Sequence, residues 1–154
     1  MIDNNNASGS IIQILANLPD FLRKPMLQSR LRAFYTMSDS DKGETINMAL
    51  SASSAIDQNK LAVLFRTWLE VLSEFDANKR IMMFQTYCQQ IILNPHSLQR
   101  LDLNLLTATF LSLESKKREL ITDSLYEALF SLHDRDKILS LIPDDSLKAI
   151  GLKR

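Results

Sequence analysis

One apolar stripe of helical period constrains the fold of this chain more than any other feature. Between residues 61 and 72, apolar side chains recur at positions i, i+3, i+4, i+7, i+8 and i+11. This spacing places them on one face of an α-helix, whereas a half-buried strand requires strict alternation. Glycine occurs three times and proline four times in 154 residues, so long stretches run without a helix breaker. The pattern predicts an all-helical fold. The stripe consists of Leu61, Leu64, Phe65, Trp68, Leu69 and Leu72.

Weaker stripes of the same period recur along the chain and predict about seven to nine helices in one domain, residues 10–154. Short breaks between them favour antiparallel helix hairpins stacked in a row, similar in architecture to HEAT or TPR arrays; the alternative is an irregular bundle. Residues 1–9 are small and polar and are predicted to form a disordered tail. The segments with an apolar face are 11–18, 21–35, 46–55, 61–74, 81–92, 98–110, 121–132, 138–141 and 147–150.

Capping and proline chemistry suggest where several helices begin and end. Ser10 is expected to cap the first helix, and Pro19 to begin the second, because proline is tolerated in a first turn. Pro25 either kinks this second helix or marks its true start. At the C-terminal end, Pro143 is expected to begin the last helix and Gly151 to end it. The apolar face expected for the second helix consists of Phe21, Leu22, Met26, Leu27, Leu31, Phe34 and Tyr35.

Two segments align with an offset of 35 residues, which suits a helix pair with two short turns. Ser38 aligns with Ser73, Asp41 with Asp76, and Ile46 with Ile81. A looser copy begins at residue 110 and a truncated one at residue 130. The alignment indicates either a degenerate helical repeat or the coincidence expected of any array of similar helices.

Composition excludes several classes of function. Lys plus Arg equals Asp plus Glu at eighteen each, which disfavours a nucleic-acid binder that relies on net positive charge. The single cysteine, Cys88, forms no disulfide within the chain. The N-terminus lacks the features of a signal peptide, and no apolar run is long enough to predict a membrane span. We therefore expect a cytoplasmic protein.

Basic residues recur where several helices are expected to begin after a turn. If the hairpins stack, these turns form a mixed-charge ridge, which either recognises a partner or consists of capped helix ends with solvated lysines. We take Lys79, Arg80 and residues 116–118 as candidates for partner binding. The basic turn residues are Lys42, Lys79, Arg80, Lys116, Lys117, Arg118 and Lys137.

Two helices carry more apolar residues than one face accommodates. Met82 and Met83 lie within the continuous apolar run 81–84, and Tyr126 and Phe130 lie opposite the main stripe of residues 121–132. Such residues either are buried on both sides of a layered array or meet a partner. We add these four residues to the candidate partner-binding set.

No catalytic constellation emerges from the sequence. Cys88 and His96 lie on either side of a proline turn, and a di-metal bundle would need Glu-x-x-His elements, which do not occur. Glu70 and Glu74, one turn apart, are interpreted as surface charges, and the glycines are too isolated to form a phosphate loop. We predict a protein that is not an enzyme and has no cofactor or metal.

The hypothesis that remains is a protein-interaction, scaffold or adaptor module, acting through a protein partner or through self-association. One alternative is a small-molecule or lipid carrier with a cavity lined by methionine and aromatic residues. A weaker alternative is nucleic-acid binding through the basic residues at 23–32 and 116–118.

Overall fold

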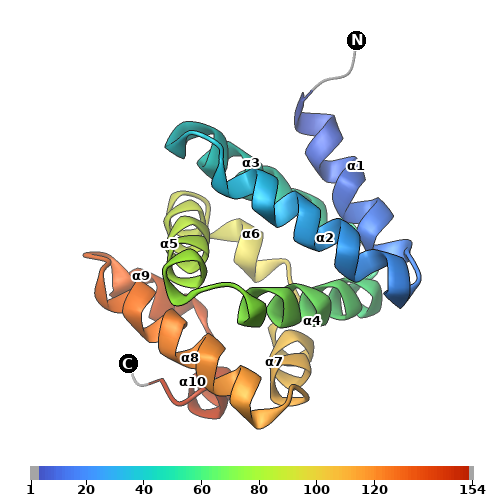
Figure 1. Cartoon of the computed structure of the whole chain (residues 1–154). Helices are drawn as coiled ribbons and strands as arrows, with labels where there is room; N and C mark the ends of the chain where they lie inside the picture. The colour runs from blue at the N-terminus through green and yellow to red at the C-terminus, as the bar shows by residue number, and fades with distance from the viewer. Residues whose placement is uncertain (1–3, 153–154) are drawn as a thin grey trace.

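Ten helices follow one another in the computed structural model, which describes residues 4–152 and their side chains from residue 11 onward (Figure 1). The prediction of an all-α fold is confirmed, with slightly more helices than expected. The helices are α1 (Asn4–Asn17), α2 (Asp20–Tyr35), α3 (Asp39–Ser53), α4 (Gln58–Glu74), α5 (Ala77–Leu93), α6 (His96–Gln99), α7 (Leu103–Leu111), α8 (Ser115–Phe130), α9 (Arg135–Leu141) and α10 (Asp144–Ala149).

The helices form two layers. Most helices pack more closely against the next helix of their own layer than against the helix that follows them in the sequence. One layer runs α1, α3, α5 and α8, and the other runs α2, α4, α7 and α10. Figure 1 shows the first helices at the top right and the last at the lower left, with α4 and α5 between them. The arrangement is a short stacked array whose two ends are far apart in sequence.

Within the first layer, α5 and α8 run parallel. Arg80 of α5 donates from Nε to Ser124 Oγ at 2.9 Å, and Gln85, further along α5, donates to Ser131 Oγ at 2.8 Å. The two bonds advance in the same direction along both helices. Because α3 packs on α5 as well, α5 is enclosed in the layer, whereas α8 is its last helix.

The core confirms the helical stripe that dominates the sequence. Leu61, Leu64, Leu69 and Leu72 of α4 are buried, and Phe65 and Trp68 pack against them from partly buried positions. Trp68 lies edge-on to Phe84 and Tyr87 of α5, and it stacks on Phe65. This aromatic cluster joins the central helices of the two layers.

Helix starts recur every nineteen residues over much of the chain. Asp76 accepts a hydrogen bond from the Lys79 amide at 3.0 Å, and Ser38 accepts one from the Asp41 amide at 3.1 Å, so both are true N-caps. Equivalent positions in α3 and α5 are therefore 38 residues apart. The alignment at 35 is wrong in register, because Ser73 lies inside α4 and Asp41 inside α3. The N-cap positions in this series are Pro19, Ser38, Asp57, Asp76, Pro95 and Glu114.

Several expected boundaries differ from the structure at the N-terminal end. α1 begins at Asn4 rather than after a cap at Ser10, so it includes residues 4–9 of the expected disordered tail; residues 1–3 lie outside the described chain. α2 continues through Pro25 as one helix. Its buried residues are Arg23, Leu27, Leu31 and Phe34.

The apolar residues at the start of α2 point outward, which corrects the expected face. Phe21, Leu22 and Met26 are exposed, because the buried stripe of this helix is set by Leu27, Leu31 and Phe34. A second correction concerns the expected single helix over 98–110. It is interrupted at residues 100–102, where Asp102 caps α7 by accepting from the Leu105 amide at 3.0 Å.

Candidate functional site

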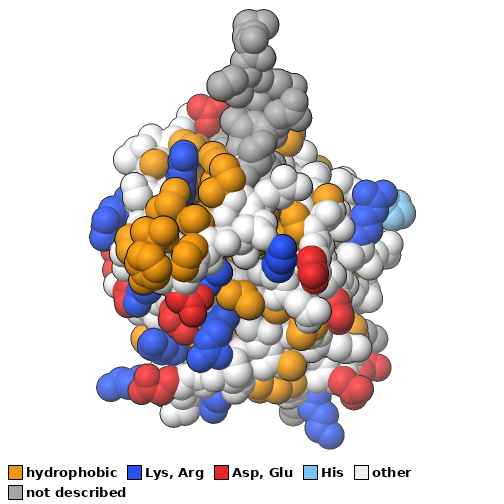
Figure 2. Space-filling view, turned by 90° about the vertical axis from the view of Figure 1, so that its right-hand side faces the viewer, with side chains coloured by type: hydrophobic (Ala, Val, Ile, Leu, Met, Phe, Trp, Pro, Cys, Tyr) orange, Lys and Arg blue, Asp and Glu red, His pale blue; other side chains and the backbone are white. Residues whose placement is uncertain are grey.

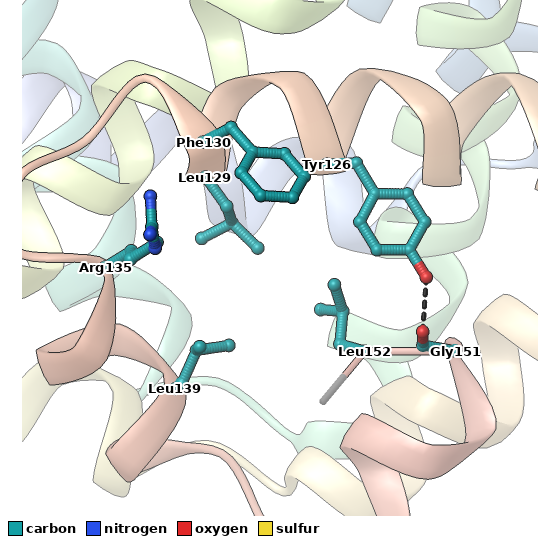
Figure 3. A pocket seen from close by; sticks show the side chains of 7 residues that line it. All are labelled: Tyr126, Leu129, Phe130, Arg135, Leu139, Gly151 and Leu152. Atoms are coloured by element: carbon teal, nitrogen blue, oxygen red, sulfur yellow. Dashed lines mark hydrogen bonds between the residues drawn. The ribbon is translucent and has the colours of Figure 1, made fainter. Parts of the chain in front are cut away.

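A half-open pocket lies where the end of α8, α9 and the C-terminal segment meet (Figure 3). Its volume is about 270 Å³. Figure 3 shows the side chains of Leu129, Leu139 and Leu152 around the space, with the ring of Phe130 at its edge. The lining residues are Tyr126, Leu129, Phe130, Arg135, Leu139, Gly151 and Leu152.

The floor of this pocket is held by the chain terminus folding back on α8. The Tyr126 hydroxyl donates to the carbonyl oxygen of Gly151. Gly151 has φ +80°, a conformation that other residues adopt only with strain, and the Leu152 amide then bonds the Leu147 carbonyl at 2.8 Å. This confirms the expected glycine at the end of the last helix and positions Leu152 in the pocket.

Phe130 is the most unusual residue of the site, because 70% of its surface is exposed. The Arg135 guanidinium carbon lies 5.6 Å from the centroid of its ring, a cation–π contact. Large apolar side chains left in water at the mouth of an apolar pocket are typical of binding anchors. The guanidinium also supplies the only charge among the pocket residues.

The outer side of α8 continues from this pocket as an acidic surface. Glu119, Asp123 and Glu127 are exposed and recur at intervals of four residues, so they share one side of the helix with Phe130. Leu120 is exposed on the same side. We call this surface, Glu119, Leu120, Asp123, Tyr126, Glu127 and Phe130, the α8 face.

The candidate Arg80 is a structural residue. It is 6% exposed, and besides Ser124 it donates to the carbonyl oxygens of Leu72 and Phe75 at the end of α4. The guanidinium therefore caps the C-terminal end of the preceding helix, where a cation is favoured by the helix dipole. A buried residue with these bonds is unavailable to a partner, and the expectation for Arg80 is corrected.

Arginines at the same place in other helices act in the same way. Arg118, the fourth residue of α8, donates to the carbonyls of Leu111 and Leu113 at 2.8 and 2.7 Å. Arg23, the fourth residue of α2, donates to the Leu15 carbonyl at 2.9 Å and to the Leu18 carbonyl. The recurring arginine is thus a cap for the helix before it. Lys42 occupies the same position in α3 and is also buried.

The other candidates fall into different surroundings. Met83 is completely buried between helices, which corrects its assignment, whereas Met82 is 39% exposed. The Lys79 ammonium lies 5.7 and 5.5 Å from the ring centroids of Tyr35 and Phe75. Lys116 is exposed and Lys117 is partly buried at the start of α8, almost four turns from Phe130. Of the nine candidates, the structure brings Tyr126 and Phe130 together in the pocket.

Glu74 and Cys88, outside this site, have pKa values that their surroundings shift. Glu74 accepts hydrogen bonds from Lys24 Nζ at 2.6 Å and Gln28 Nε2 at 3.0 Å, and the bond from Lys24 is the main reason that the pKa of Glu74 is lowered. Burial raises the pKa of the Cys88 thiol to about 12. In the described part of the chain, no three His, Cys, Asp or Glu side chains are grouped to hold a metal ion.

The basic cluster at the start of the chain is dispersed. Arg23 is turned inward and Lys24 is paired with Glu74, which leaves Arg30 and Arg32 exposed on α2. None of the helices described is long and apolar enough to cross a membrane.

Sequence reasoning missed most of the pocket wall. Arg135 and Leu139 belong to a short helix whose signal in the sequence is limited to the apolar residues 138, 139 and 141. Leu152 reaches the pocket because the chain reverses at Gly151, and a glycine signal predicts the turn but not its neighbour. Comparison with protein-family models, with curated proteins and with solved structures gives no match.

Proposed function

We propose that this protein is an interaction module that binds a helical segment of a protein partner on the α8 face. The observation that carries the proposal is Phe130, exposed to 70% at the mouth of an apolar pocket. An anchor of this kind, surrounded by polar groups, is the usual centre of a protein–protein contact.

The size of the pocket favours a protein partner over a carried small molecule. Pockets for drug-sized ligands span about 300–1,000 Å³ and bury most of the ligand. The volume here is about 270 Å³ and the pocket is half open, which suits one or two apolar side chains presented by a larger surface. The acidic row of Glu119, Asp123 and Glu127 favours basic residues on that partner.

The test is a selection from a phage-displayed library of randomised helical peptides against the immobilised protein. We expect enriched peptides to carry a large apolar residue and, two to three turns away, Lys or Arg. Phe130→Ser is expected to reduce binding of these peptides at least tenfold. Phe21→Ser, the same change at an exposed phenylalanine on α2, is the matched control and should leave it unchanged. Peptides that bind the Phe130→Ser protein equally well would rule the proposal out.

A further inference from the structure

The opposite end of the array carries a second exposed apolar surface. Phe21, with 76% of its surface exposed, is accompanied by the exposed Leu22, Pro25 and Met26 on the outer side of α2. Figure 2 looks onto this end of the molecule and shows hydrophobic side chains gathered into one patch. Terminal elements of stacked arrays lack the neighbour that buries such a surface in the interior.

The charge beside this patch is opposite to that of the acidic row on the α8 face. Beyond Met26, the outer side of α2 carries the exposed Arg32, and the only acidic residue of α2 is Asp20 at its start. The α8 face instead carries Glu119, Asp123 and Glu127. We call Phe21, Leu22, Pro25, Met26 and Arg32 the α2 face.

The two faces also match in length. Arg32 follows Phe21 by eleven residues on α2, and Phe130 follows Glu119 by eleven residues on α8. Eleven residues are close to three helical turns, so each charge lies on the same side of its helix as the phenylalanine, about 16 Å away. In antiparallel contact, Phe21 meets the Phe130 pocket where Arg32 meets Glu119.

We infer that the partner of the α8 face is the α2 face of a second copy of this chain. The inference rests on the proposed function and names its partner. Because the two surfaces are different, the contact is heterologous, and it adds copies head to tail until a ring closes or a filament grows. The ionic part of the contact makes the association weaken as salt is added.

Sedimentation of the full-length protein tests the inference, with circular dichroism confirming that each variant is folded. The weight-average mass of the wild type should rise from one copy to more than two as the concentration increases from micromolar to millimolar, and it should fall again in high salt. Phe21→Ser and Phe130→Ser should each remain a single copy. A mass that stays at one copy throughout the wild-type series overturns the inference.

Mixing the two blocked variants separates this contact from a symmetric one. The Phe21→Ser chain keeps its α8 face and the Phe130→Ser chain keeps its α2 face, so the mixture should form a complex of two copies and no more. Val63→Ser, an exposed apolar position on α4, is a control that should behave as the wild type. Absence of a complex in the mixture, or association of either variant alone, contradicts a head-to-tail contact.

A charge exchange tests the orientation of the two helices. Adding Glu119→Lys to the Phe21→Ser chain should weaken the mixed complex at least fivefold. Adding Arg32→Glu to the Phe130→Ser chain should then restore it. Restoration supports the antiparallel contact, and failure to restore it overturns that contact. The peptide selection described above tests the α8 face independently. If the chain binds peptides there but never self-associates, the proposed function is supported and this inference is wrong.

Discussion

In the sequence, α5 and α8 each carry more apolar residues than one helix face accommodates. The structure buries Met83 of α5 but exposes Phe130 of α8. Met83 of α5 is fully buried because α3 and α8 pack on both sides of that helix. Phe130 of α8 is exposed because α8 is the last helix of its layer. The same pattern therefore indicates a core in the middle of an array and a contact surface at its end. Four predictions test this difference.

The first prediction contrasts the chemical access of the two helices. Cys88, the chain's single cysteine, is buried on α5 with its pKa raised to about 12, so at pH 8 almost none of it is thiolate. We expect a thiol reagent to label the native protein at least about a thousandfold more slowly than the urea-unfolded chain. In the variant that combines Cys88→Ala with Asp123→Cys, the thiol on the α8 face should react at nearly the unfolded rate.

The pH dependence sharpens this contrast. The labelling rate of native Cys88 should rise with pH well above pH 9, because the thiolate fraction of a group with a pKa near 12 still increases tenfold per pH unit there. The labelling rate of the thiol introduced on the α8 face should level off near pH 9, because an exposed thiol has an ordinary pKa of about 8.5. Equal rates at the two sites in the native state would mean that α5 is as open as α8.

The second prediction concerns packing. Met83→Ala should lower the free energy of unfolding by about 2–5 kcal/mol, the range for truncating a large buried side chain. Met82→Ala, one residue away and partly exposed, should lower it by less than about 1 kcal/mol. Urea denaturation of the two variants measures both values. If Met82→Ala lowered the free energy of unfolding as much as Met83→Ala, the enclosed position of α5 would not explain the loss of stability at Met83.

The third prediction compares the same arginine cap in the interior and near the end. Arg80→Ala should cost about 2–3 kcal/mol, because it removes a buried charged donor from the Phe75 carbonyl and from the buried Ser124 hydroxyl. Arg118→Ala should cost about 1 kcal/mol, since Arg118 is only partly buried and water can replace it at the carbonyls. Thermal and urea denaturation give the two values. Equal losses would indicate that burial does not distinguish the two caps.

Local patterns in the sequence were sufficient to predict the helices but not their surroundings. The α4 stripe is buried as expected, and α5 ends before Asn94 and Pro95 because these residues terminate helices. The outward turn of Phe21 was not predictable, since an apolar residue on a helix looks the same whether it enters the core or faces water. Which of these happens depends on where α2 lies in the array.

The site was predicted only in part for the same reason. Tyr126 and Phe130 were predicted as candidates for partner binding because they fall outside the main stripe of their helix, and the structure places both at one pocket. Arg80 was misassigned, since a basic residue after a turn resembles a surface charge until the carbonyls of the preceding helix are seen beside it. The spacing of 38 residues between Arg80 and Arg118 is the sequence signal that identifies their shared role.

The fourth prediction has the smallest effect on stability and separates binding from folding. Phe130→Ser should change the free energy of unfolding by no more than about 0.5 kcal/mol, because the side chain is mostly in water and few contacts are lost. Tyr126→Phe is a matched change in the same pocket that removes the hydroxyl bonded to Gly151, and it should cost about 1 kcal/mol. Urea denaturation at a concentration below self-association measures both. If Phe130→Ser destabilises the chain as much as Met83→Ala does, then Phe130 belongs to the core. The contrast between a buried apolar residue on α5 and an exposed one on α8 would then be lost.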